Sequence, residues 1–255
     1  FYRDPVWTPD GNRIVALRSS TQERDARVEE MGPATGLDVI WIPSAGGAIS
    51  LIVPARGAGR PHFTAEKDRV FVYSQQGLLS FRFDGTDRRT HLKVVSKNIM
   101  QAPDPPAASE VRLSPTGQQA LALVNHDLYL LDVPVTGGEA PTIDITSPAV
   151  PVKKLTDIGA DSFGWADGGK TVYWALGSSY FRQPVSTIVF EPDKPEADKA
   201  SGEGKQDGSP ANVAKPDRKP SYEEVAITIE VPQHKPSGTV VLRGGRVITM
   251  QGDQV

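Results

Sequence analysis

Short apolar runs, each preceded by a polar turn, recur through the first 190 residues of the chain. The four copies begin at a large apolar residue and read WTPDGNRIVAL (7–17), FTAEKDRVFVY (63–73), LSPTGQQALAL (113–123) and WADGGKTVYWA (165–175). They start 56, 50 and 52 residues apart. A period of about 40 to 50 residues with strands inside it is typical of propeller blades.

Each copy predicts a strand that ends in a turn and returns as a second strand. Pro in the turn presets φ and Gly accepts a positive φ, so the chain reverses easily. The second strands are 14–17, 70–73, 120–123 and 172–175, and their nearly continuous apolar character predicts burial on both faces. Third strands are expected at 37–42, 77–83, 126–132 and 179–182, and fourth strands at 49–53, 90–95 and 152–155.

Helix signals are nearly absent, so the predicted fold class is all-β, with about four blades in an incomplete ring. Inserts at 19–36 and 97–108 are expected to be loops. We expect the residues that open the copies to pack in the core and two aspartates to form turns: Trp7, Phe63, Leu113 and Trp165 in the first group, Asp10 and Asp84 in the second.

The composition changes after residue 190. Residues 191–222 contain many Pro, Lys, Asp, Gly and Ser and few large apolar side chains, which predicts a linker or a long surface loop. Residues 225–231 alternate as a half-buried strand does, and 238–255 predict a hairpin. The expected domains are therefore blades in 1–190, a linker in 191–222 and the start of a small β-sandwich in 223–255.

Bulk properties exclude some classes of function. The net charge is −3, and no basic surplus favours nucleic acid. The chain contains no cysteine, which excludes disulfides and a cysteine nucleophile. No run of 18 apolar residues is present, so no transmembrane segment is predicted, and no signal peptide is visible.

The repeats resemble TolB-type, WD40-like β-propeller repeats, whose usual cue is an apolar residue followed by Ser/Thr-Pro-Asp-Gly and an apolar strand. Copy one matches closely and copy three in part, whereas copies two and four lack the proline. The resemblance implies a propeller over roughly 1–190 and, by analogy, a periplasmic or exported protein. It does not define a chemistry.

Residues 238–250, GTVVLRGGRVITM, resemble the beginning of metal-dependent amidohydrolases of the imidazolonepropionase and dihydroorotase kind. The resemblance implies a sandwich and a catalytic barrel downstream, with a zinc-type divalent metal in that barrel and the barrel as partner in the same chain. Its ligands would begin with a His-x-His pair. No two of the histidines, His62, His91, His126 and His234, have this spacing, so no metal ligand, cofactor-binding residue or catalytic residue is assigned to this chain.

Other motifs give no site. Gly-x-Ser-x-Gly and His-Glu-x-x-His are absent, and the glycine-rich stretch 202–208 has the wrong spacing for a phosphate loop. We interpret His126-Asp127 as a solvent-facing pair beside a turn, and His62 as a hydrogen-bonded structural histidine.

Two hypotheses follow. The first is a non-catalytic propeller segment of a metal-dependent amidohydrolase, in which the parent protein is the enzyme and this segment alone is not. The alternative is a TolB-like propeller that binds a protein or peptide partner in the cell envelope. A propeller that gates a serine peptidase is a weaker third possibility.

Overall fold

The structure is a computed structural model of the 255-residue chain, and it describes residues 1–22, 25, 38–54, 57–96, 105–190 and 221–232, with isolated positions up to 245. Residues 191–220 of the linker predicted at 191–222 lie outside these residues, as do most of the loops and of the hairpin at 238–255. Among the described residues no helix has the length and apolarity needed to cross a bilayer.

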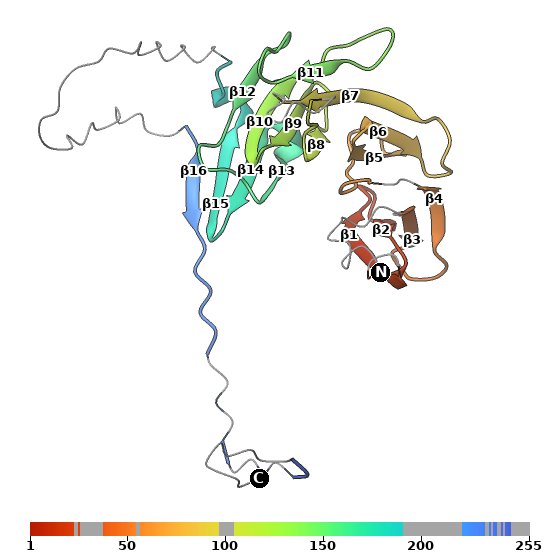
Figure 1. The fold of residues 1–255 in the computed structure, drawn as a ribbon, viewed down its shortest axis with the longest axis vertical. Coiled ribbons are helices and arrows are strands. Elements are labelled where there is room, and N and C mark those ends of the chain that lie inside the picture. The colour runs from red at the N-terminus through yellow and green to blue at the C-terminus, as the bar shows by residue number, and fades with distance from the viewer. Residues whose placement is uncertain are drawn as a thin grey trace, which may run out of the picture.

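Four sheets of four strands stand side by side along the chain (Figure 1). The first contains β1 (Tyr2–Trp7), β2 (Arg13–Arg18), β3 (Asp38–Pro43) and β4 (Ser50–Pro54). The second contains β5 (Arg69–Ser74), β6 (Gly77–Arg82), β7 (Arg89–Val95) and β11 (Thr142–Asp144). The third contains β8 (Glu110–Leu113), β9 (Gln119–Val124), β10 (Asp127–Asp132) and β12 (Val152–Lys154).

The fourth sheet contains β13 (Ser162–Ala166), β14 (Thr171–Leu176), β15 (Ser179–Pro184) and β16 (Glu223–Ala226). Two 3₁₀ turns, η1 (Asp167–Gly169) and η2 (Val185–Thr187), flank its central strands. The all-β prediction is confirmed. Each predicted second, third and fourth strand is present with its ends shifted by one or two residues.

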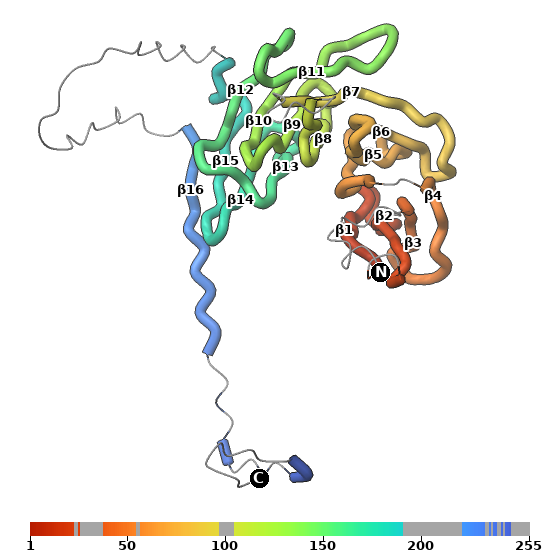
Figure 2. The backbone as a smooth tube through the Cα atoms, viewed as in Figure 1, coloured from red at the N-terminus to blue at the C-terminus, as the bar shows by residue number. Residues whose placement is uncertain are grey.

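Three buried clusters join consecutive sheets. Val15, Leu17, Val70, Val72 and Phe81 connect the first two sheets. A second cluster, around Tyr73, Leu92, Val111 and Ala122, connects sheets two and three, and a third, around Leu128, Phe163 and Trp174, connects sheets three and four. No such cluster among the described residues joins sheet four to sheet one, so the sheets form an open arc (Figure 2).

The polar turn of the motif is held by a buried hydroxyl group. Thr8 Oγ1 accepts the Arg13 amide at 3.1 Å, and Ser114 Oγ accepts the Gln119 amide at 3.2 Å. Asp10 accepts hydrogen bonds from Thr8 and from the amide of Asn12, as predicted for a turn former. The Ser/Thr of the motif therefore closes the turn from inside, since the hydroxyl group replaces a missing backbone partner.

Two predictions about copy openings need correction. Trp7 is 58% exposed, because the face of β1 that carries it points away from the second sheet. The first strand of copy two is reduced to a single bridge between His62 and Phe71. Leu113 is buried as predicted, and Phe63 and Trp165 pack half-buried against the clusters.

The fourth sheet ends differently from the prediction for 225–231. The strand begins at Glu223, ends at Ala226 and pairs antiparallel with β15, so it completes the fourth sheet. Ile227, Ile229 and Val231 beyond it are exposed, which contradicts a half-buried strand. The backbone bonds to β15 determine the position of this segment, because its side chains find little apolar surface to cover them.

Candidate functional site: a cleft between the first two sheets

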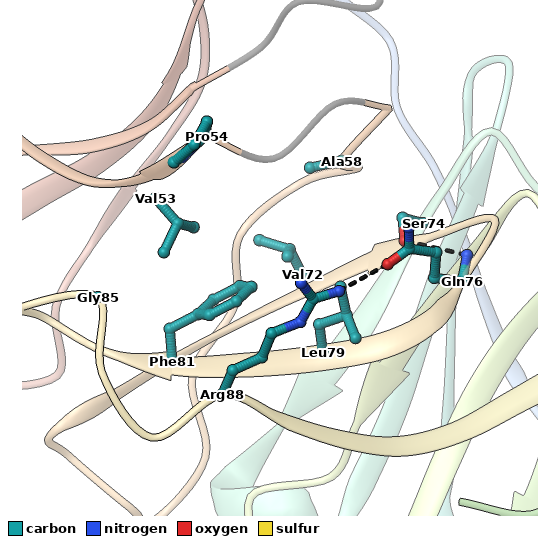
Figure 3. Close-up of a pocket in the computed structure, with 10 residues that line it drawn as sticks. All are labelled: Val53, Pro54, Ala58, Val72, Ser74, Gln76, Leu79, Phe81, Gly85 and Arg88. Carbon is teal, nitrogen blue, oxygen red and sulfur yellow. Dashed lines mark hydrogen bonds between the residues drawn. The ribbon is translucent and has the colours of Figure 1, made fainter.

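A cleft of about 680 Å³ opens between the first and second sheets (Figure 3). One side is formed by the end of β4 and the following segment, and the other by β5, β6 and the turns that bound β6. It is lined by Val53, Pro54, Ala58, Val72, Ser74, Gln76, Leu79, Phe81, Gly85 and Arg88.

The floor of the cleft is apolar because of strand alternation. Val72 on β5 pairs with Leu79 on β6, and Phe81 follows two residues later on the same face. All three side chains are buried and belong to the cluster between the two sheets. The cleft is therefore an opening into the hydrophobic interface between two blades, with a preformed apolar floor.

Three polar residues surround the mouth. Arg88 Nη2 donates to the side-chain oxygen Oε1 of Gln76 at 2.6 Å, and the backbone N–H of Gln76 donates to Ser74 Oγ at 3.2 Å (Figure 3). The Arg88 guanidinium carbon lies 6.0 Å from the centroid of the Phe81 ring. The mouth therefore presents a cation and an amide directly above an apolar floor.

The neighbouring arginines point to the opposite face of the second sheet. Asp87 pairs with Arg69 at 2.6 Å, with Arg89 at 2.9 Å and with Arg82 at 3.3 Å. Hydrogen bonds from Arg89 and then from Arg69 lower the pKa of Asp87 to about 2. Arg88 lies in the turn before β7 and reaches the cleft, whereas Asp87 is held by these arginines.

A buried polar network lies on that opposite face. Arg69 Nε and Nη2 donate to Ser80 Oγ at 3.0 and 2.9 Å, and His91 Nε2 lies 2.7 Å from the same oxygen. Desolvation, followed by the charge of Arg69, lowers the pKa of His91. Ser80 is fully buried, so this serine–histidine pair serves as a structural hydrogen-bond network within the blade.

The histidines discussed in the sequence analysis do not form a catalytic group among the described residues. His62 Nε2 accepts the amide of Leu113 at 3.1 Å across the interface of sheets two and three, as expected for a structural histidine. His126 is exposed beside the turn, and Asp127 pairs with Lys154 at 2.7 Å. Within the described ranges no three His, Cys, Asp or Glu side chains gather as a metal site, so these residues do not fit a catalytic divalent metal.

The sequence analysis did not find the cleft. Its lining comes from two repeats, and the residues at its mouth sit in ordinary turns. Residues 66–89 contain four arginines, at 69, 82, 88 and 89, and four acidic residues, at 66, 68, 84 and 87, so the sequence does not single out Arg88.

Comparisons with known proteins concern the fold alone. No family model and no curated protein match the chain. Solved structures similar to it include TolB from Acinetobacter baumannii, at 13% identity, with 71% of this chain and 40% of that chain covered and a TM-score of 0.43. Oligogalacturonate lyase from Vibrio parahaemolyticus is 9% identical, with 73% and 52% covered and a TM-score of 0.43.

A gluconolactonase from Xanthomonas campestris is 11% identical, with 68% and 53% covered and a TM-score of 0.43. The chain thus spans 40% to 53% of these three structures. They are a TolB protein and two enzymes of different chemistry.

Proposed function

We propose that this chain is a non-catalytic propeller module that binds a protein or peptide partner, with the cleft between the first two sheets as the binding site. The cleft carries the proposal. Its volume of about 680 Å³ is within the usual range of ligand sites, which combine an apolar lining with a few polar groups.

A peptide segment suits this shape. Val53 and Pro54 form one wall and β5 and β6 the other, so a side chain can enter between the sheets while its backbone stays at the mouth. Burial of one Leu- or Phe-sized side chain contributes about 1.5 to 3 kcal/mol, which is a factor of roughly 10 to 150 in affinity.

A tryptophan at position 53 tests the proposal. Random dodecapeptides displayed on phage are selected on the wild-type chain and measured by fluorescence anisotropy. Val53→Trp fills the cleft and is expected to weaken binding of the selected peptides at least tenfold. Leu51→Trp, on the same strand but on the exposed opposite face, is the control and should leave binding unchanged. Equal binding to both variants, or no selected peptide, contradicts the proposal.

A second candidate rests on the amidohydrolase resemblance of residues 238–250, most of which lie outside the described residues. In that case the module flanks a metal-dependent barrel in the same polypeptide. Periplasmic export is a separate proposal, which rests on the TolB-type resemblance of the repeats. The test is the reading frame downstream. A His-x-His pair followed by alternating strands and helices supports the candidate, and its absence refutes it.

A further inference from the structure

We propose that the cleft recognises a peptide carboxylate next to an apolar side chain, with Arg88 as the residue that selects the carboxylate. This inference rests on the proposed function, since it specifies the ligand chemistry of the same cleft. Two observations support it. The other arginines of the arc have ion-pair or aromatic partners, and Arg88 lies at the mouth of the cleft above its apolar floor.

Arg88 differs from the other arginines of the arc. Ion pairs with Asp or Glu engage Arg3, Arg18, Arg60, Arg69, Arg82, Arg89, Arg112 and Arg182. Arg13 lies between the rings of Trp41 and Phe83, at 4.7 and 4.6 Å. Within the part of the chain that the structure describes, Arg88 contacts only a neutral acceptor, the side-chain oxygen of Gln76.

The surroundings of Arg88 favour an anionic ligand. A guanidinium group presents five N–H donors in a planar fork, and one bond to an amide uses only a part of them. A carboxylate accepts two such donors at once, and charge-assisted hydrogen bonds are about twice as strong as neutral ones. The Phe81 ring lies 6.0 Å from the guanidinium carbon of this exposed side chain, so the cation and the apolar floor are close enough to contact one ligand.

The floor determines what must accompany the carboxylate. Val72, Leu79 and Phe81 offer no polar side-chain atom, so a buried ligand group there has to be apolar. Gln76 bonds to Arg88 through its side-chain oxygen and to Ser74 through its backbone N–H. Its side-chain NH₂ group can donate to the second ligand oxygen. The expected ligand is therefore an aliphatic or aromatic residue followed by a carboxylate, either the chain terminus or an acidic side chain.

Three fluorescein-labelled pentapeptides test this chemistry. The first ends in leucine with a free carboxylate, the second is its carboxy-terminal amide, and the third is an amide with glutamate after the leucine. Anisotropy titrations use the wild-type chain, Arg88→Gln and Arg88→Lys. Arg182→Gln is the matched control, because it removes an exposed arginine from the fourth sheet.

At least one carboxylate-bearing peptide is expected to bind the wild type tenfold or more tightly than the plain amide. Arg88→Gln should erase this preference, Arg88→Lys should keep part of it, and Arg182→Gln should keep all of it. Which of the two acids binds more tightly identifies the terminus or the side chain as the ligand group.

Equal binding of the free acids and the amide overturns the inference but leaves the cleft as a peptide site, provided Val53→Trp still abolishes binding. A carboxylate preference that survives Arg88→Gln also overturns it. Failure of these peptides and of the phage selection together refutes the proposed function as well. Sodium decanoate that binds in an Arg88-dependent manner while no peptide does would replace the peptide by a fatty acid.

Discussion

His62 shows how a single side chain joins two blades. It is half-buried, accepts the Leu113 amide, and its ring lies tilted at 5.6 Å from the ring of Phe71. Desolvation, and then the charge of Arg112, lowers its pKa to about 3. The imidazole is therefore neutral in the folded chain at ordinary pH, and its Nε2 is an acceptor only in that form.

This arrangement predicts a loss of stability in mild acid. The unfolded pKa of 6.5 lies above the folded value of about 3, so the folded state binds fewer protons. The contribution of His62 is complete above pH 6.5 and decreases as the pH falls toward 3, by up to about 1.4 kcal/mol per pH unit. His91 acts in the same direction, since its pKa is also lowered.

Urea titrations at pH 7.5, 6.0 and 4.5 measure the effect. The drop in unfolding free energy over this range should be markedly smaller in His62→Gln, whose amide oxygen can still accept the Leu113 proton. Asp10 and Asp87 titrate near pH 2 and do not interfere in this range. The same drop in both proteins would mean that His62 does not govern the acid sensitivity.

At the scale of the element, β11 ties two blades together. It leaves the third sheet between β10 and β12, crosses to the second sheet and pairs in parallel with β7, where Ile143 lies opposite Val94. Ile143 is 4% exposed and packs in the cluster that joins sheets two and three. The insert between two strands of one blade thus completes the neighbouring sheet.

Truncation of this side chain should therefore destabilise both blades. Ile143→Ala is expected to reduce the unfolding free energy by about 2 to 5 kcal/mol, as for other large buried aliphatic side chains. Val135→Ala, in the same insert but fully exposed, is the control and should change it by less than about 0.5 kcal/mol. Equal effects of the two variants in urea titrations would show that β11 contributes nothing to the interface.

Among the described residues, the four sheets form a row in which buried clusters join each sheet to its neighbours. Sheets two and three are covered on both faces by the buried clusters, whereas sheets one and four are each joined to one neighbour through the described residues. In such a row, the free energy of unfolding is close to the sum of the stability of each sheet and of each interface between neighbouring sheets. The inner sheets therefore gain two interface terms and the outer sheets one.

Native-state hydrogen exchange should reveal this gradient. Amides in the central strands β5, β6, β9 and β10 are expected to exchange more slowly than those in β2, β3, β14 and β15. With equal backbone pairing in all four sheets, the difference must come from the interfaces. Uniform protection across the arc would contradict the additive description.

The sequence by itself determined the repeat, the second and third strands of each blade and the turns. These follow from local rules, since a buried strand must be apolar and the turn of WTPDG needs residues with suitable φ and a side-chain acceptor such as Asp10. Residues 70–73 were predicted as doubly buried from their composition, and all of β5 is buried.

Only the tertiary structure decided what lies between the blades. Three features depend on which surface lies next to each segment: the exposure of Trp7, the transfer of β11 to the second sheet and the pairing of β16 with β15. The hydrophobicity of a segment does not specify which surface it packs against. The same holds for the cleft. The role proposed for Arg88 depends on the pairing of Asp87 with three other arginines and on the end of β4, which lines the same cleft as Phe81. Contacts between residues far apart in the chain create that role, and no local pattern encodes it.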